Sequence, residues 1–311
     1  MTEQNRNPSQ PESRVLTPVI VSASRATDIP AFYGDWLQER IAAGWLDWRN
    51  PFSGRLHRVS FAKTRLFVFW TKYPQPFFPV LDWLEERGYH YYFQFTLNDY
   101  EQENWEPGLP ALQERIRSFV ELSERLGREK VVWRWDPLIT NARLSPELLL
   151  ERIQAVGKIL HPHTERLVFS FVDIAAYRRV RSRLDKLGEP ITEISPEIQD
   201  RLAGGISRIN QNWNLQLATC AERIDLAQYG IEHNRCIDDR LIVRLFAEDK
   251  KLMAALGCTG DNATPPLETE AERHKRLKDK GQRPACGCIR SKDIGQYNSC
   301  RFGCIYCYAQ R

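Results

Sequence analysis

The sequence predicts an α/β protein built on a parallel sheet. Short apolar runs alternate six times with segments of helical character, as in a chain of strand–helix units. The runs are apolar along their whole length, which is typical of strands covered by helices on both faces. Because residues 15–260 are close to the ~250 residues of a complete barrel, we expect a (β/α) barrel-like fold of TIM type, complete or partial.

Each element of this fold follows from local sequence. Strands are expected at 15–24, 66–71, 89–97, 130–135, 167–172 and 215–219. Helices are expected at 31–43, 78–87, 111–126, 146–160, 176–187 and 196–210, with two more before residue 257. Ser145 and Ser195 each precede Pro-Glu, which is typical of a helix N-cap and first turn. The stretch 45–54, rich in Trp, Asn, Pro and Gly, is expected to be a loop.

Composition places the chain among ordinary globular proteins. Its 311 residues are 42% apolar and 27% charged, and the net charge of +4 neither requires nor opposes a phosphate-bearing partner. We expect no membrane span, because no apolar run is long enough, and no secretory signal, because the first residues are polar. A cytoplasmic location is therefore predicted, where clustered thiols indicate metal or redox chemistry rather than disulfides.

Changes in composition predict four parts of the chain. Residues 1–14 are expected to be a disordered tail, and 15–260 the barrel-like domain. Residues 261–285 contain two prolines and a charged run without an apolar stripe, so they are expected to be a tether. Residues 286–311 form a cysteine-rich segment, expected to dock on the carboxyl-terminal face of the strands.

Polar residues stand at or just past the ends of the predicted strands. In parallel α/β folds this edge binds ligands, so these residues are candidates for a catalytic pocket: Arg25, Asp28, Lys72, Arg134, Asp136 and Glu222. The alternative is that they cap helices and form salt bridges at the rim of the sheet.

Three cysteines near the end of the sequence carry the clearest chemistry. Cys300, Cys304 and Cys307 have C-x3-C-x2-C spacing, which lets three thiolates reach one metal centre. A cubane iron–sulfur cluster normally takes four thiolates, so a local set of three leaves one iron open. The alternative is a zinc site, but only Cys304 and Cys307 have the C-x2-C spacing of zinc elements.

This triad, with Tyr306 before its last cysteine, resembles the signature of radical S-adenosylmethionine enzymes. The string YNSCRFGCIYCYAQR at 297–311 is similar to the cluster loop of spore photoproduct lyase and related repair lyases. In the standard architecture, however, that loop follows the first barrel strand, whereas here it follows the last. The superfamily's Gly-Gly-Glu methionine-binding element has no match, because Gly204-Gly205 is followed by Ile206.

The chain also resembles an uncharacterised bacterial family, the domain-of-unknown-function family numbered 1848, which is known for a radical-SAM-like cysteine cluster at its C-terminus. The matching stretches are SRATDIP, FWTKYP, WRWDP, CAERIDL and the terminal cysteines, so nearly the whole chain is covered.

The radical S-adenosylmethionine resemblance implies a specific chemistry. Cys300, Cys304 and Cys307 would hold a 4Fe–4S cluster whose fourth iron binds S-adenosylmethionine, and Tyr306 would lie beside the adenine. One electron from the cluster would cleave the sulfonium and give a 5′-deoxyadenosyl radical, with the protein positioning and shielding it. A reducing electron donor is the implied partner, and a nucleic-acid substrate is compatible with the lyase resemblance.

Four other cysteines form a second candidate metal set: Cys220, Cys236, Cys286 and Cys288. Four thiolates can hold a second iron–sulfur cluster or a structural zinc ion, and such a site would fix the terminal segment to the rim. The alternative is that Cys220 and Cys236 are ordinary buried thiols. Cys258 is expected to be structural.

Three functional hypotheses follow. The first is an iron–sulfur enzyme of radical S-adenosylmethionine type with an unknown substrate. The second is a non-catalytic or redox metal-binding protein in which Cys288 completes the coordination of the triad. The third is a zinc-stabilised barrel whose rim carboxylates act as a hydrolase, which needs two converging carboxylates.

Overall fold

The computed structural model describes residues 15–175, 177–188, 190–258 and 268–310. The tail predicted at 1–14 and part of the tether predicted at 261–285 lie outside the described residues. Within 268–285 the chain forms a helix, α10 (Glu270–Leu277), whose N-cap Thr269 makes a capping box with Glu272.

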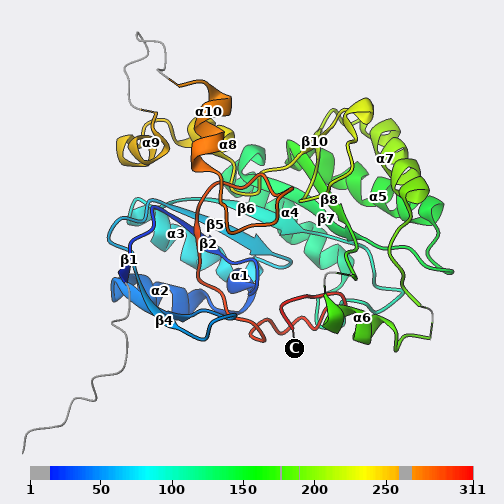
Figure 1. Cartoon of the computed structure of the whole chain (residues 1–311), viewed down its shortest axis with the longest axis horizontal. Coiled ribbons are helices and arrows are strands. Elements are labelled where there is room, and N and C mark those ends of the chain that lie inside the picture. The colour runs from blue at the N-terminus through cyan, green and yellow to red at the C-terminus, as the bar shows by residue number, and fades with distance from the viewer. Residues whose placement is uncertain (1–14, 176, 189, 259–267, 311) are drawn as a thin grey trace, which may run out of the picture.

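An eight-stranded parallel sheet forms the middle of the protein, with helices on both of its faces (Figure 1). Its order is β10-β9-β8-β7-β6-β5-β2-β11, and every neighbouring pair is parallel. The strands are β2 (Ile20–Ala23), β5 (Leu66–Thr71), β6 (His90–Thr96), β7 (Val131–Leu138), β8 (Arg166–Phe171), β9 (Gln216–Thr219), β10 (Ile231–His233) and β11 (Lys292–Asp293). The mixed α/β class is confirmed, and this strand order is compatible with a barrel-like fold.

The helices connect successive strands of the sheet. They are α1 (Ile29–Phe32), α2 (Gly34–Ala42), α3 (Phe78–Glu86), α4 (Leu112–Leu126), α5 (Pro146–Leu160), α6 (Arg178–Leu184), α7 (Pro196–Asn210), α8 (Asp239–Phe246) and α9 (Lys250–Leu256), followed by α10. The predicted caps are confirmed, because the side chain of Ser145 accepts a hydrogen bond from Leu148 N and that of Ser195 from Ile198 N.

Three local predictions were wrong. The expected strand at 15–24 is divided into β1 (Val15–Leu16) and β2, which belong to different sheets. The expected loop at 45–54 contains β3 (Trp45–Arg49), which pairs antiparallel with β4 (Leu56–Ser60). β4 also pairs in parallel with β1, so these three strands form a second, smaller sheet. The helix expected at 31–43 is divided into α1 and α2 at Tyr33, whose backbone leaves the helical region with φ −137°.

The two faces of the large sheet differ in polarity. One face is aromatic and packs against helices in the larger hydrophobic core, with side chains such as Phe69, Phe93 and Trp135 completely buried. The opposite face, which should also be apolar according to the sequence prediction, carries the buried polar side chains Gln94 and Arg134 near the carboxyl ends of its strands. Buried polar groups require partners. The two side chains hydrogen-bond to each other, and they also donate to the carbonyl and the Sγ atom of Cys236, in the loop after β10.

The terminal segment joins the sheet as its last strand. β11 pairs with β2 in parallel register, Lys292 opposite Val21 and Asp293 opposite Ser22. Just beyond it, the amide of Gln296 donates to Thr27 Oγ1 over 2.9 Å, and Trp48 Nε1 donates to the Gly295 carbonyl over 3.0 Å. In Figure 1 this segment runs from α10 past β2 toward α6, where the chain ends.

Gly295 allows this docking because a side chain does not fit there. A Cβ atom at this position would lie 1.8 Å from Ser24 Oγ and 2.7 Å from Ser24 Cβ. Ser24 Oγ is held in place, because it accepts hydrogen bonds from the amides of Ala26 and Thr27. The terminal segment and the β2–α1 loop are therefore in contact through backbone and small side chains.

We predict that Gly295→Ala weakens the attachment of the terminal segment. Relieving the clash should cost about 1–3 kcal/mol of unfolding free energy, measured by urea denaturation, and should increase proteolysis near residue 295. Gly188→Ala is the matched control, because a Cβ there meets no atom of the described residues within 4 Å. Equal stability of the two variants would contradict tight docking.

Candidate functional site

The loop that carries the cysteine triad crosses the carboxyl ends of the central strands. Tyr308 Oη donates to the Arg25 carbonyl after β2 over 2.9 Å. The Ile305 amide donates to the Trp105 carbonyl over 3.0 Å, in the loop that follows β6. Gly303 turns the chain between the first two cysteines with φ +67°, a conformation that favours glycine. The triad thus lies at the edge where parallel sheets bind ligands.

The three thiols lie close enough to affect one another. Burial raises the pKa of Cys304, and negative charge at Cys300, Cys307 and Glu106 raises it further, while Lys72 opposes this effect. Burial also raises the pKa of Cys300. The thiols of Cys300 and Cys304 are therefore expected to be protonated at neutral pH, and a bound metal would have to displace their protons.

Arg183, in α6, holds the carbonyl groups of the triad loop. Its guanidinium donates to the Ile305 carbonyl over 3.0 Å, to the Gln310 carbonyl over 3.1 Å and to the Cys307 carbonyl. One cationic side chain thus satisfies three carbonyl groups that no strand or helix pairs.

Beside the triad, Lys72 and Glu106 form a buried ion pair with Nζ and Oε1 2.7 Å apart. Tyr306 Oη donates to the same carboxylate oxygen and accepts from Lys72 Nζ over 3.0 Å. Asn98 Nδ2 donates to Glu106 Oε1 over 3.1 Å. Arg115 lies 3.5 Å from the second carboxylate oxygen. Tyr306 is therefore fixed by its hydroxyl to the end of β5 and to the loop after β6.

The charges of this network stabilise each other. Burial alone would raise the pKa of Glu106, but Lys72 and Arg115 outweigh it, so the pKa of Glu106 is lowered. Burial alone would lower the pKa of Lys72, but Glu106 outweighs it, and the pKa of Lys72 is raised. Both groups are thus held in their charged forms next to Cys304.

Asp28 combines two structural roles at the same edge. Its Oδ1 accepts from the Ala31 amide over 3.0 Å and caps α1, and its Oδ2 accepts from the Lys72 amide over 2.7 Å. Burial raises the pKa of Asp28 to about 7. The structure therefore supports the capping alternative for Asp28 while placing it beside Cys300, whose pKa it affects.

Asp136 links the triad side of the edge to a second group of thiols. Its amide donates to Asn98 Oδ1 over 3.0 Å, and its carboxylate pairs with Arg134 and accepts from Ser170 Oγ. Arg134 Nη1 in turn donates to Cys236 Sγ over 3.1 Å. Burial would raise the pKa of Asp136, but Arg134 outweighs it and the pKa is lowered.

Glu222 lies at the same edge, after β9. Its Oε1 accepts from the Phe171 amide over 3.0 Å at the end of β8. Burial raises the pKa of Glu222 to about 7, and the charge of Asp136 adds to the effect. Glu222 and Asp136 thus come near each other, but the carboxylate of Asp136 is already paired.

The structure brings the second candidate cysteine set together. Cys220 Sγ lies 3.6 Å from Cys236 Sγ. The thiols of Cys236 and Cys288 lie close enough to affect each other's pKa, and so do those of Cys288 and Cys286. Negative charge at Cys288, Asp293 and Cys236 raises the pKa of Arg25, against the effect of burial. Arg25 and Arg134 therefore both face these thiols. Cys258 lies apart from both sets, where it accepts from Arg273 Nη1 over 3.6 Å.

The thiols are close, but they are not set around a common point. In the described part of the chain, no group of three or more histidine, cysteine, aspartate or glutamate side chains is arranged to hold a metal ion. Binding at either set therefore requires thiol protons to leave and side chains to turn.

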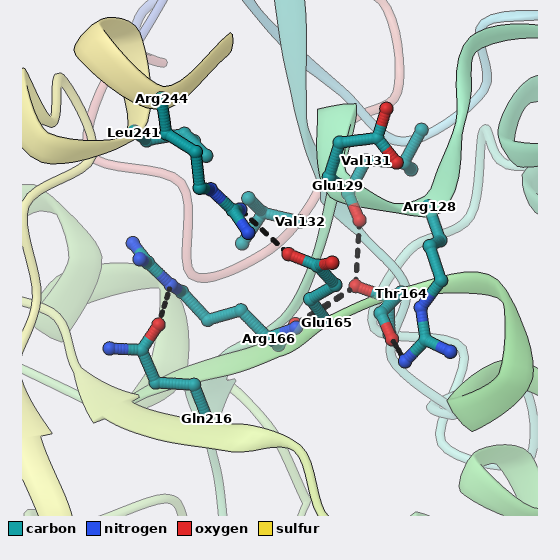
Figure 2. A pocket seen from close by; sticks show the side chains of 10 residues that line it. All are labelled: Arg128, Glu129, Val131, Val132, Thr164, Glu165, Arg166, Gln216, Leu241 and Arg244. Carbon is teal, nitrogen blue, oxygen red and sulfur yellow. Dashed lines mark hydrogen bonds and ion pairs between the residues drawn. The ribbon is translucent and has the colours of Figure 1, made fainter.

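A separate cleft lies at the amino ends of β7, β8 and β9 (Figure 2). It is lined by Arg128, Glu129, Val131, Val132, Thr164, Glu165, Arg166, Gln216, Leu241 and Arg244. Its arginines have protein partners: Arg244 pairs with Glu165, Arg166 with Gln216 and Asp238, and Arg128 with the Thr164 carbonyl. Two of these arginines are thus paired with carboxylates, and the candidate site is the carboxyl edge, where the sequence-predicted residues lie.

Several residues of the site had no local signal in the sequence. Glu106 lies in an irregular loop, Arg115 in α4 and Arg183 in α6, so their convergence depends on tertiary structure. Gly204 and Gly205 lie inside α7, where a Cβ on Gly205 would meet Leu150 Cδ1 at 2.4 Å. Packing of α7 against α5 thus accounts for Gly205.

The fold and this edge define an α/β protein with a parallel sheet and two groups of thiols near the carboxyl ends of its strands. The family profile described as "Domain of unknown function (DUF1848)" matches residues 20–309, and the chain belongs to this family. No curated protein and no solved structure matches the chain. Among the described residues, no helix has the length and apolar character needed to cross a membrane.

We predict that Glu106→Gln destabilises the protein by about 3–5 kcal/mol, because it leaves buried Lys72 and Arg115 without a countercharge. Urea denaturation at pH 7 measures the loss. Asp47→Asn is the control, since it breaks the exposed Arg58–Asp47 pair and should cost less than about 1 kcal/mol.

The pH dependence tests the same network. The pKa of Glu106 is lowered in the folded state. Ionised Glu106 therefore makes its full contribution to the free energy of unfolding above the pKa of an unfolded glutamate, about 4.3. This contribution is lost as the pH falls through the lower pKa that Glu106 has in the folded protein. Glu106→Gln should therefore flatten the loss of stability at acid pH, and an unchanged acid limb would contradict the buried pair.

Proposed function

We propose that this protein is an iron–sulfur enzyme of radical S-adenosylmethionine type. Cys300, Cys304 and Cys307 would hold a 4Fe–4S cluster with one open iron, which would supply an electron to bound S-adenosylmethionine. We also propose that the sheet is a partial TIM-type (β/α) barrel, which is supported by its consecutive strand order from β2 to β10.

One observation carries the proposal: the other cysteines near the edge are engaged elsewhere. Cys288 Sγ accepts from the Ile237 amide over 3.5 Å and lies close enough to Cys236 to affect its pKa. The triad is instead surrounded by Asp28, Lys72 and Glu106. Three thiols without a fourth fit a cluster with an open iron better than the closed coordination of structural zinc.

The residues of this chain would position and shield such a cluster. Tyr306 is fixed by Lys72 and Glu106, so the segment between Cys304 and Cys307 is held firmly against the sheet. The ammonium group of Lys72 raises the fraction of thiolate at Cys304 by opposing the effect of burial on its pKa. Both effects favour binding of an anionic thiolate cluster at this edge.

Two observations weigh against the other hypotheses. Completion of the triad by Cys288 would require Cys288 to leave Cys236 and the Ile237 amide. A rim hydrolase would use Asp136 and Glu222, but the Asp136 carboxylate is paired with Arg134 and hydrogen-bonded by Ser170. Free cysteines throughout the chain suit the reducing cytoplasm that we propose as its location.

The test is anaerobic reconstitution with iron and sulfide, followed by reduction in the presence of S-adenosylmethionine. The wild type should bind about four irons per chain at the triad and release 5′-deoxyadenosine. Cys304→Ser should abolish the release and lower the iron content, whereas Cys258→Ser should leave both unchanged.

An intact cluster that neither cleaves S-adenosylmethionine nor changes its electron paramagnetic resonance spectrum when the compound is added would contradict the proposal. Stoichiometric zinc at the triad, with no iron binding after reconstitution, would also contradict it.

A further inference from the structure

Cys220, Cys236, Cys286 and Cys288 come from three separate places in the chain. Cys220 follows β9, Cys236 follows β10, and 286–288 precede β11. The Ile289 amide donates to the Ile237 carbonyl over 3.1 Å, so the two segments also pair through their backbones. The four thiols therefore gather where the segments next to the two edge strands meet.

We infer that these four thiols form a closed site for a single thiophilic ion of the zinc class, separate from the triad. The inference is independent of what the triad binds. Structural zinc sites have four ligands and no open position, and their thiols are protected from solvent. Three of the four thiols are at most 9% exposed: Cys236, Cys286 and Cys288.

N–H groups already point at the sulfur atoms. Cys236 Sγ accepts from Arg134 Nη1 over 3.1 Å and from Asn234 Nδ2 over 3.2 Å. Cys288 Sγ accepts from the Ile237 amide over 3.5 Å. Donors of this kind stabilise the negative charge of thiolate ligands and orient them.

The two arginines beside the thiols keep unused donors. Arg25 Nη2 and Arg134 Nε are buried and have no hydrogen-bond partner among the described residues. A buried N–H group without a partner destabilises the folded state. A site with four thiolates and one divalent ion has a net negative charge, which would add to Asp293 and Asp136 in balancing the charges of the two guanidinium groups.

The spacing favours one ion over a cluster. Tetrahedral zinc with Zn–S bonds of about 2.3 Å places its sulfur atoms about 3.8 Å apart. The Cys220–Cys236 sulfur distance is 3.6 Å. In a cubane each thiolate binds a different iron, so the sulfur atoms lie farther apart. Ligation requires the remaining thiols to turn toward the same centre and to lose their protons.

Gly287 makes the meeting of the two segments sterically feasible. A Cβ atom there would lie 2.8 Å from the Asn234 carbonyl oxygen and 3.0 Å from Arg235 Cγ. The small residue between Cys286 and Cys288 thus lets the terminal segment approach the loop after β10. An ion held by both segments would join them and hold the segment that leads to the triad.

The test is metal analysis of the full chain, expressed in medium with zinc and purified anaerobically. The wild type should carry about one zinc per chain. Cys236→Ser and Cys288→Ser should lose it, while Cys258→Ser and the triple variant Cys300→Ser, Cys304→Ser, Cys307→Ser should keep it. Zinc-edge X-ray absorption of the wild type should give four sulfur neighbours at about 2.3 Å, which is decisive even where a variant does not fold.

Two results would overturn the inference. One is a triple variant that still binds about four irons per chain after reconstitution, which would assign a second cluster to the four thiols. The other is a wild type without zinc in which a thiol reagent titrates all four side chains. If the triad proposal is wrong, iron binding and S-adenosylmethionine cleavage fail while the zinc content is unchanged. Failure of the zinc site and failure of the triad proposal can therefore be distinguished.

Discussion

The pairing of β11 with β2 is the constraint on which the rest of the site depends. It joins residues that are about 270 positions apart in sequence, and it leads residues 294–310 across the carboxyl ends of β2, β5 and β6. Bringing together residues so far apart in sequence has an entropic cost of loop closure, which the contacts of the docked segment must offset. Gly295, Thr27 and Trp48 fix the exit from this strand, and Arg183 holds the final turn.

Buried charge is organised around this docked segment in two places. Lys72, Glu106 and Arg115 support Tyr306 on the triad side, and Arg134 with Asp136 supports the four-thiol set. Asn98 connects them, because it donates to Tyr306 Oη over 3.0 Å and accepts from the Asp136 amide. The two groups of thiols are thus held by one continuous polar network over the end of the sheet.

The sequence predicted the class of fold because buried strands and capped helices leave strong local patterns. It also predicted that rim residues such as Lys72 and Asp136 lie at one edge, since parallel strands end on the same side. It could not predict β10 and β11, which have three and two residues, or β3, whose polar and aromatic composition resembles a loop. Glu106 and Arg183 were missed because only tertiary packing brings them to the cysteines. Asp28 caps a helix, which was the alternative to a catalytic role.

Anomalous X-ray diffraction from crystals grown anaerobically, measured at the iron and zinc edges, tests the central claim most directly. That claim divides seven cysteines into an open set of three and a closed set of four. We expect iron-edge density at Cys300, Cys304 and Cys307, and a zinc peak among Cys220, Cys236, Cys286 and Cys288. A metal bound at once by Cys288 and the triad, or zinc in place of iron at the triad, would contradict the division.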